Sequence, residues 1–557
     1  MKSYDLIAGG DWVGPVHQLR GQPFGTVRAE NSTIIGALGD HARARPNALF
    51  LTEVGTGPRP EQITFGEAHA EVERRTALLA SWGLARGERV GVLGNNSIHF
   101  VLAVLAVLEA GAAAVLLSRD DPPRRLDARA RFVQMRFLLH DSDYAGLAQA
   151  CASLERACSF QEFDRLARFP AGDRQDLRGV VKPTDGALVL FTSGTTGSPK
   201  AVVQSHYAVA QNARALADHH RIQSEVRLLC VLPLHHVNGL EFTIFAAMVG
   251  GGHTVISRGF DLLRFWKTVR QHGIHIISLV PNLLSQLADR PGLRGGEPLQ
   301  VRYAVSAAAP LPTAVAERAW ERLGLPIVQG YGLSEVTNFS CLMPLDLPAR
   351  EYERWMFGGR RTCVGPCLPG QEVQIREGEG AAPPEVEGEI AIRGHCVMSG
   401  YLHNPTATEQ AFRGGWFRTG DLGYHLLHPD GRAYFHISGR IREIAKRSGA
   451  MVNLLELDEV LASIPGVADA GAAAFDNTWV GEELGALVVR GRGCTLTQEG
   501  IAEECRRALP FSAVPKVIQF VDQIPRTSSG KIRRAEIAER FTAFRDRLFT
   551  ERNAGEA

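Results

Sequence analysis

Short apolar runs alternate with longer amphipathic stretches along the chain from Ile34 onward. The stretch after Thr64 predicts a helix with a charged outer face that ends near Gly83, and 89–94 predicts the strand that follows it. Strands separated by helices of this size indicate βαβ units and parallel sheets. Residues up to about Ser32 show no clear period and are expected to form a lead-in arm. Further strands are predicted at 228–232, 254–256, 274–279 and 301–305.

One apolar segment, Phe100 to Leu117, is almost long enough to cross a membrane. It carries Glu109 and Gly111 in mid-run, so a helix that ends near Gly111 and a buried strand over 114–117 explain it better. The first residues also lack the apolar core of a signal peptide. We therefore expect a cytoplasmic protein without a membrane span.

The chain has 557 residues, which is too long for one hydrophobic core and predicts two or more domains. Its 61 basic and 60 acidic residues nearly cancel, so no long-range field favours nucleic acid or an anionic membrane. The nine cysteines are scattered and odd in number, which indicates a reducing compartment. Cys363 and Cys367 are the closest pair, but no second pair completes a zinc site, and buried thiols are expected.

The segment Leu188 to Lys200, LVLFTSGTTGSPK, predicts a buried strand followed by a loop of hydroxyls and glycines that ends in a lysine. Glycines allow close backbone approach, so amides, hydroxyls and the ammonium would converge on one anion, as a polyphosphate cradle requires. A solvated turn is the plainer alternative. A Walker A loop is excluded because Pro199 precedes the lysine and Ala201 follows it.

Five later segments combine turn residues with chemistry-bearing side chains, although each also has a purely structural interpretation as a turn or a solvated surface. PLHHVNGL is expected to be an exposed loop at a strand end, and Glu335 in QGYGLSE is a hard oxygen ligand suited to Mg²⁺. WFRTGDLG contains Asp421 and is followed by an Asp430-Gly431 hairpin turn. The others are SGRIREIAKRSGA (438–450) and PRTSSGKIR (525–533), which carries Lys531.

Together with VSAAAPL (305–311), these motifs resemble, in order, those of the adenylate-forming superfamily of acyl-CoA synthetases, peptide-synthetase adenylation domains and firefly luciferase. The resemblance covers roughly 34–534. It implies an α/β fold with a large N-terminal domain of βαβ-built sheets plus a β-barrel-like part, and a small mobile α+β C-terminal domain. The expected domains are 1–440, which binds ATP and the acid, and 441–557, a lid that carries the catalytic lysine.

The resemblance also implies roles for individual residues. Lys531, Glu335 and His236 are the expected catalytic residues, and Glu335 is the expected metal ligand. Expected ATP or AMP contacts are Thr192, Ser193, Gly194, Thr195, Thr196, Gly197, Lys200, Ala307, Ala308, Gln329, Gly330, Tyr331, Gly332, Ser334, Asp421 and Arg440. The hinge and thiol channel are expected at Arg442, Lys446, Ser448 and Gly449, and the acid pocket at His236, Val237, Asn238, Gly239, Asn338 and Cys341.

Four positions depart from the usual family residues: Ala307 replaces a glycine, Ser334 a threonine, Leu454 a proline, and Arg442 an aspartate or lysine. The Asp that binds the amino group in peptide-synthetase domains is missing near His236, so an α-amino acid substrate is disfavoured.

The implied function is ATP-dependent activation of a carboxylic acid through an acyl-adenylate, followed by transfer to a thiol. ATP, Mg²⁺ and coenzyme A are the expected cofactors, and a small carboxylic acid is the expected partner. A ligase that loads a separate carrier protein is the first alternative, with that protein's phosphopantetheine as the thiol. A non-catalytic nucleotide-binding scaffold is the second, and a P-loop kinase or ATPase, which would release ADP, is the third.

Overall fold

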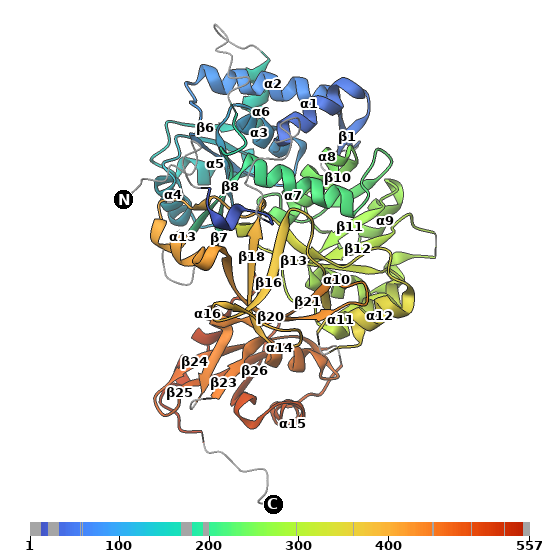
Figure 1. Cartoon of the computed structure of the whole chain (residues 1–557), viewed down its shortest axis with the longest axis vertical. Helices are drawn as coiled ribbons and strands as arrows, with labels where there is room; N and C mark the ends of the chain where they lie inside the picture. Colours follow the sequence, from blue (N-terminus) through green and yellow to red (C-terminus); the bar gives the residue numbers. More distant parts are fainter. Residues whose placement is uncertain are drawn as a thin grey trace, which may run out of the picture.

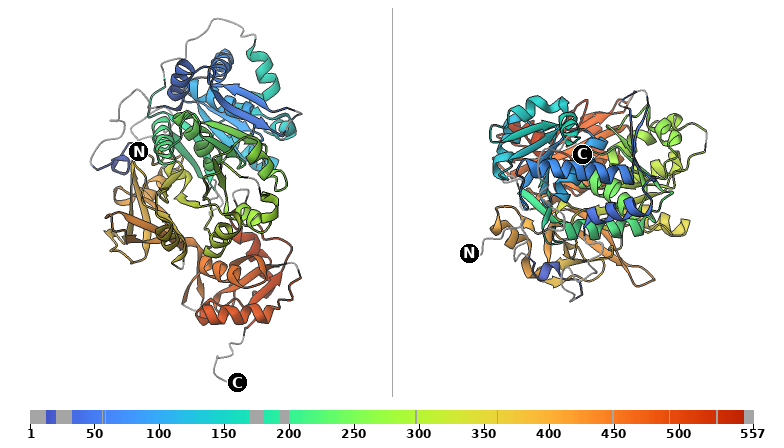
Figure 2. Two further views of the ribbon diagram at one scale, coloured as in Figure 1. Left: turned by 90° about the vertical axis from the view of Figure 1, so that its right-hand side faces the viewer. Right: turned by 90° about the horizontal axis from the view of Figure 1, so that it is seen from above.

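The computed structural model describes residues 13–20, 33–168, 181–192 and 200–549, apart from 56, 58, 297, 360, 448–449, 492 and 528–529. Two large sheets and their helices form the upper part of the molecule in Figure 1, an antiparallel sheet lies in the middle, and the C-terminal elements lie at the lower end. The two further views in Figure 2 show the same arrangement from the side and from above.

The first large sheet joins parallel strands to an antiparallel edge. The parallel strands come from the βαβ units that the sequence predicts, whereas β8 and β19 pair antiparallel beyond β7. The order is β19 (Gly400–Tyr401), β8 (Lys200–Ser205), β7 (Gly186–Thr192), β4 (Ala113–Leu117), β3 (Arg89–Leu93), β5 (Phe137–His140) and β6 (Arg156–Ser159).

The second large sheet has eight strands, of which the two edge strands β14 and β2 are antiparallel to their neighbours. It includes the four strands predicted between residues 228 and 305, each shifted by one or two residues at its ends. The order is β14 (Phe339–Leu342), β13 (Ile327–Gly332), β12 (Tyr303–Ser306), β11 (Ile276–Leu279), β9 (Arg227–Cys230), β10 (His253–Ser257), β1 (Leu49–Val54) and β2 (Glu61–Thr64).

Helices cover these two sheets. The predicted helix after Thr64 is α2 (Phe65–Ser81), and it begins with a reciprocal cap: Glu67 N donates to Thr64 Oγ1 at 3.2 Å, and Thr64 N donates to the Glu67 carboxylate at 2.9 Å. The other helices of this part are α1 (Ile34–Ala44), α3 (Ile98–Glu109), α4 (Pro123–Phe132), α5 (Ala145–Gln149), α6 (Phe160–Ala167), α7 (His206–His219), α8 (Ala247–Gly250), α9 (Phe265–Gln271), α10 (Pro281–Ala288), α11 (Thr313–Leu323), α12 (Ala349–Phe357) and α13 (Pro405–Ala411).

The apolar segment from Phe100 to Leu117 is the core helix α3 followed by strand β4, as predicted. Every residue from Phe100 to Leu108 is buried, because α3 packs against α2 and against strands of both large sheets. Gly111 adopts a positive φ of +71° in the turn between them. Among the described residues, no helix combines the length and the apolar character that crossing a bilayer requires.

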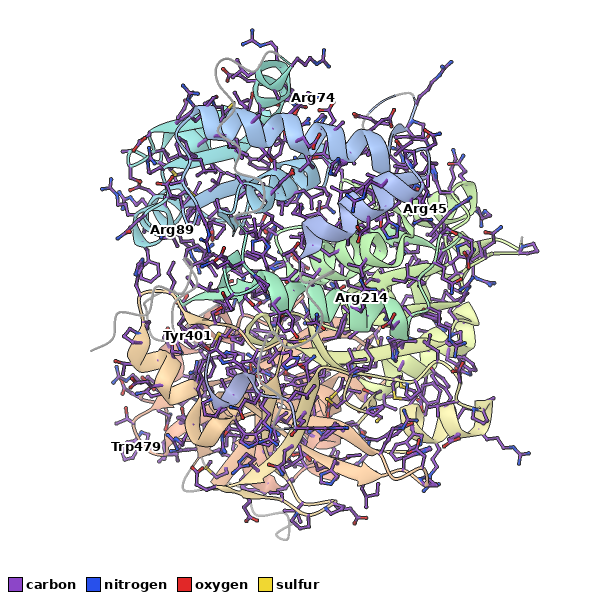
Figure 3. The ribbon with its side chains drawn as sticks, turned by 45° about the horizontal axis from the view of Figure 1, so that its top comes forward. Arg45, Arg74, Arg89, Arg214, Tyr401 and Trp479 are labelled. Carbon is purple, nitrogen blue, oxygen red and sulfur yellow. The ribbon has the colours of Figure 1, made fainter. Side chains whose placement is uncertain are left out.

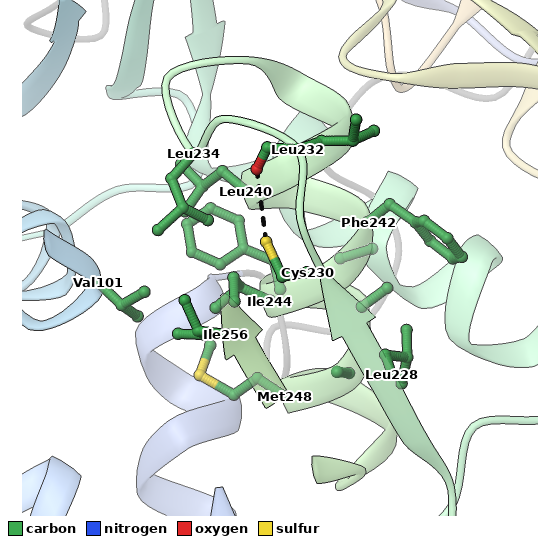
Figure 4. Packing of buried hydrophobic residues seen from close by; sticks show 14 of the residues in the cluster. Val101, Leu228, Cys230, Leu232, Leu234, Leu240, Phe242, Ile244, Met248 and Ile256 are labelled. Atoms are coloured by element: carbon green, nitrogen blue, oxygen red, sulfur yellow. Dashed lines mark hydrogen bonds between the residues drawn. The ribbon is translucent and has the colours of Figure 1, made fainter. Parts of the chain in front are cut away.

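The segment PLHHVNGL is not the exposed loop that we expected. His235 is buried, and a π-helix runs from Asn238 to Ala246 with every residue buried. Gly239 lies so close to the preceding turn that a Cβ there would stand 2.4 Å from the Pro233 carbonyl oxygen. Figure 4 shows the apolar side of this π-helix packed against the strands that carry Leu228, Cys230 and Ile256, with the Cys230 thiol donating to the Leu232 carbonyl oxygen.

The middle of the molecule is a six-stranded antiparallel sheet with its own hydrophobic cluster. The predicted Asp430-Gly431 turn joins two of its strands. The described part of the lead-in arm packs on this sheet, since His17 is fully buried and its Nε2 lies 2.9 Å from the Met398 carbonyl oxygen. The order is β15 (Cys363–Gly365), β21 (Ala433–Arg440), β20 (Phe417–Leu427), β18 (Gly388–Gly394), β16 (Gln371–Glu377) and β17 (Gly380–Ala381).

The C-terminal part is α+β, as predicted, and it builds a core from its own residues, among them Leu457, Leu461, Leu484 and Ile501. The α/β fold class with a large N-terminal part and a small C-terminal part is therefore confirmed. The strands are β22 (Ile444–Arg447), β23 (Ala450–Asn453), β24 (Val467–Asn477), β25 (Gly481–Arg490) and β26 (Val517–Phe520), and the helices are α14 (Leu454–Ser463), α15 (Gln498–Ala508) and α16 (Arg534–Glu539).

Candidate active site

The predicted phosphate loop connects two paired strands. Thr192 ends β7 and lies opposite Lys200, the first residue of β8. The loop positions Ser193, Gly194, Thr195, Thr196 and Gly197 lie outside the described residues, so their role stays a prediction. The described residues at the two ends of the loop, Thr192 and Lys200, lie side by side in the sheet.

Lys200 points toward an aromatic residue that the sequence did not single out. Its Nζ lies 4.6 Å from the centroid of the Tyr401 ring, a cation–π distance. The Tyr401 hydroxyl in turn donates to Glu335 Oε1 at 3.2 Å. Partial burial lowers the pKa of Lys200, and the nearby Arg442 guanidinium lowers it further. The predicted metal ligand, the end of the phosphate loop and the predicted hinge residue therefore lie together.

Tyr401 reaches this position through sheet pairing. Tyr401, which Figure 3 labels, belongs to the two-residue strand β19 and pairs with Val202 of β8, the strand that begins at Lys200. Burial, followed by the Glu335 carboxylate, raises the pKa of the Tyr401 hydroxyl, which is therefore a neutral donor. Because the contact joins residues far apart in the chain, no local signal predicts it.

Asp421 is the centre of a second polar group. It lies on β20 directly opposite Arg440 on β21, and Arg440 Nε is 2.8 Å from its Oδ1. The Tyr331 hydroxyl donates to Oδ2, also at 2.8 Å. Asp421 raises the pKa of Arg440, and burial followed by Asp421 raises the pKa of Tyr331. These contacts hold the carboxylate in place at the cavity described below; its contact with ATP or AMP stays a prediction.

The two glycines beside Tyr331 serve packing. Gly330 and Gly332 lie within strand β13. A Cβ on Gly332 would stand 1.6 Å from the Asn338 carbonyl oxygen, and one on Gly330 would stand 2.5 Å from the Phe339 ring. The strand therefore needs glycine so that the chain after Glu335 can fold back against it.

Lys531 comes from the C-terminal part, at the tip of a small turn. The Lys531 carbonyl oxygen accepts from Thr527 N at 2.8 Å, and Lys531 N donates to Thr527 Oγ1 at 3.1 Å. Arg526 fixes the turn further, since it donates to the Gly530 carbonyl oxygen at 2.9 Å and pairs with Asp469 at 2.6 Å. A side chain at this position is thus presented by a short, well-braced segment.

One cavity, which we call the central cavity, brings Lys531 together with the N-terminal groups. It is lined by Ala308, Gln329, Gly330, Tyr331, Gly332, Asp421 and Arg440 from the large part, and by Glu459 and Lys531 from the small part. Lys531 is open to solvent within it but surrounded by protein atoms. This partial desolvation, followed by the Arg440 charge, lowers the pKa of the ammonium.

The residues predicted for the acid pocket are mostly neighbours. Asn338 Nδ2 lies 3.4 Å from the Val237 carbonyl oxygen, and Asn238 Oδ1 accepts from Ser278 at 2.8 Å. His236 is a neutral imidazole, because burial lowers its pKa to about 4, with the Lys531 charge acting in the same direction. The structure does not bring Cys341 to this group, since its side chain is fully buried in the cluster of the antiparallel sheet.

For the remaining predicted residues, the structure gives the exposure or the backbone conformation but no contact that tests the predicted role. Ala307 is buried, whereas Ala308 takes a positive φ of +71° at the edge of the central cavity. Arg442 and Lys446 are exposed, and Ser448 and Gly449 lie outside the described residues, so the thiol channel stays a prediction. Leu454, where the family usually has proline, opens α14 behind an Asn453 cap.

This fold is that of the adenylate-forming superfamily, as two family models show. The family model for AMP-binding enzymes matches residues 38–402, and the model for the C-terminal domain of AMP-binding enzymes matches residues 456–531. The first match spans more than half of the chain, which therefore belongs to the AMP-binding enzyme family. The resemblance seen in the motifs is confirmed.

Similar proteins include several CoA ligases. An oxalate–CoA ligase of Arabidopsis thaliana is 29% identical over 92% of this chain and 99% of its own length. A sulfoacetate–CoA ligase of Cupriavidus necator is 29% identical over 91% of this chain and 97% of its own length. The crystal structure of ATP-bound MatB from Rhodopseudomonas palustris superposes with a TM-score of 0.81 at 24% identity, covering 93% of this chain and all of that one, and so supports the fold.

Proposed function

We propose that this protein is an AMP-forming acid–thiol ligase that activates a carboxylic acid with ATP and then transfers the acyl group to coenzyme A. One observation carries the proposal: Lys531 of the C-terminal part lines the same cavity as Tyr331, Asp421 and Arg440. The Glu335 carboxylate acts on the pKa of Lys531, and Lys531 acts on the pKa of His236, which supports a position of Lys531 near both the predicted metal ligand and the predicted acid pocket.

In the first step a carboxylate oxygen of the acid attacks the α-phosphorus of ATP, and the bond to the bridging oxygen of pyrophosphate breaks. Both reactants are anions, so the site must offset charge rather than supply a base. Lys531 would lie beside the α-phosphate and the attacking oxygen, and Lys200 beside the departing pyrophosphate. Mg²⁺ held by Glu335 and phosphate oxygens would neutralise part of the leaving group's charge. Neutral His236 would wall the acid pocket without adding charge.

In the second step the thiol attacks the acyl carbon and AMP leaves. We propose that residues 441–557 form a lid that turns about Arg442 between the steps, withdraws Lys531 and admits the pantetheine. Free coenzyme A is favoured over a carrier protein because similar proteins that cover almost the whole chain are named as CoA ligases. Loading of a separate carrier protein is the alternative.

The acid is proposed to be small or partly polar, because the predicted acid pocket includes two polar side chains, Asn238 and Asn338. The names of relatives do not narrow it, since they include oxalate, sulfoacetate and, in Mycobacterium tuberculosis, long-chain fatty acids. A pyrophosphate-exchange screen over short, aromatic, dicarboxylic and long-chain acids would identify the class.

The deciding experiment incubates the protein with Mg²⁺, ATP and the acid panel, with coenzyme A in one arm and a pantetheinylated carrier protein in the other. AMP, pyrophosphate and an acyl-CoA thioester, identified by mass, are the expected products. Thioester on the carrier alone would favour the alternative. Release of ADP would indicate a kinase or ATPase, and absence of exchange with every acid would indicate a nucleotide-binding scaffold.

A further inference from the structure

The turn that follows Glu335 is strained. Thr337 has φ +71° and ψ −72°, and Asn338 N donates to the Val336 carbonyl oxygen at 3.0 Å, which closes a γ-turn. A β-branched residue rarely adopts a positive φ, so the surrounding structure must hold this conformation. The turn sets the direction of Glu335 on one side and of Asn338 on the other.

The side chain of Gln204 donates hydrogen bonds to the backbone of this turn. It is fully buried on β8, and its Nε2 donates to the Ser334 carbonyl oxygen at 2.9 Å and to the Thr337 carbonyl oxygen at 3.0 Å. Both partners are acceptors, so they fix the orientation of the amide and use both of its N–H groups. The remaining atom, Oε1, is buried and receives no hydrogen bond from any described residue.

A second buried group lies beside the same amide. Glu241 lies in the π-helix Asn238–Ala246, is fully buried, and interacts with the side chain of Gln204. Neither of its carboxyl oxygens receives a hydrogen bond from the described residues. An ionised carboxylate accepts only, and the N–H groups of Gln204 are already committed, so an ionised Glu241 would leave buried acceptors on both side chains without a donor. A single proton on Glu241 resolves the conflict by turning one acceptor into a donor.

We propose that Glu241 is a positioning residue, a neutral carboxylic acid that donates its O–H to Gln204 Oε1 and so braces the turn that carries Glu335. Burial raises the pKa of Glu241 well above its ordinary value; the interaction with Gln204 lowers it, but burial outweighs that effect, in agreement with the protonated form. The same π-helix begins with Asn238 and Gly239, so the brace ties the wall of the acid pocket to the metal ligand. The inference rests on the proposed function only in assigning Mg²⁺ to Glu335.

Three substitutions, singly and with one combined pair, test the brace. Glu241→Leu removes the donor and leaves Gln204 Oε1 unpaired, whereas Glu241→Gln keeps a donor in the same place. We expect Glu241→Leu to weaken ATP binding roughly tenfold in the presence of Mg²⁺, by calorimetry, but not in EDTA, and we expect Glu241→Gln to restore it. In a Gln204→Leu background, Glu241→Leu is expected to add nothing further. Equal weakening with and without Mg²⁺ would mean a general packing defect and would overturn the proposal.

An infrared measurement tests the proton without relying on binding. The difference spectrum between the unmodified protein and Glu241→Gln is expected to contain the C=O stretch of a protonated carboxylic acid, and only the band of an ionised carboxylate would overturn the assignment. This readout holds even if Glu241→Leu fails to fold. If the unmodified protein bound no ATP while the band was present, the proposed function would fail and the protonated Glu241 would stand.

Discussion

Glu459 offers a sensitive test of how the C-terminal part closes on the rest of the molecule. It projects from α14 into the central cavity, and its Oε1 lies 3.0 Å from Nη1 of Arg361 in the large part. The two side chains are only 23% and 12% exposed. Burial raises the pKa of Glu459 to about 7; Arg361 counteracts this in part, while Asp458 and Glu456 add to it. Desolvation therefore outweighs the ion pair.

Because the pKa of Glu459 is raised in the observed arrangement, the sign of the pH effect on closure follows. In an open arrangement Glu459 would face water with a pKa near its ordinary value of 4.5, so closure of the lid takes up a proton. The contribution of Glu459 to closure is complete below pH 4.5 and is lost as the pH rises toward about 7. At about 1.4 kcal/mol per pH unit over the difference between 4.5 and about 7, the total is at most about 3.5 kcal/mol. Between about pH 6 and pH 8 the closure constant falls roughly tenfold.

The assay compares acid-dependent pyrophosphate exchange in the unmodified protein and in Glu459→Gln across this range. The ratio of the two rates cancels the titration of Lys531, which both proteins share. We expect the ratio to fall roughly tenfold from about pH 6 to pH 8. Glu499→Gln, a change at an exposed position on α15, is the matched control and is expected to follow the unmodified protein. A constant ratio would refute the reasoning, and a rising one would mean that the ion pair outweighs desolvation.

Three further changes test the site itself. Lys531→Ala is expected to slow adenylation by roughly 10²–10³, the cost of one preorganised charge partner, and to leave thioester formation from premade acyl-adenylate largely intact; equal loss in both steps would contradict its role. Tyr401→Phe removes the hydrogen bond to Glu335 and is expected to raise the half-saturating Mg²⁺ concentration about fivefold, and an unchanged Mg²⁺ titration would argue against that contact. Gly332→Ala places a Cβ on the Asn338 carbonyl oxygen and is expected to cost about 1–3 kcal/mol in thermal unfolding, whereas an unchanged Tm would mean that the turn yields freely.

The sequence predicted what is local. The helix predicted after Thr64 forms as α2, where Thr64 and Glu67 lie within one turn and cap it, and the predicted Asp430-Gly431 turn joins its two strands. The alternation of apolar runs predicted the βαβ units, because a buried strand needs little beyond its own residues and its flanking turns. Motifs with several fixed positions likewise predicted which residues would gather at one site.

Contacts between distant segments were not predictable from spacing. Tyr401 meets Glu335 only because β19 pairs with β8, and Glu459 meets Arg361 only because α14 docks on the large part. The prediction that PLHHVNGL forms an exposed loop was wrong for a related reason. Its polar residues suggested solvent, but Asn238 finds a buried partner in Ser278, which tertiary packing alone supplies.

The charges around Lys531 suggest why the two proposed half-reactions follow a fixed order. Closure of the proposed lid would bring its ammonium toward Arg440, a second cation, and Asp421 already pairs with that arginine. Burial first and the Arg440 charge second lower the pKa of Lys531, so both oppose this approach of the charged ammonium. A bound triphosphate would supply the missing negative charge, so ATP would favour closure. Departure of pyrophosphate removes most of that charge, and the same repulsion would then help the lid to open for the thiol.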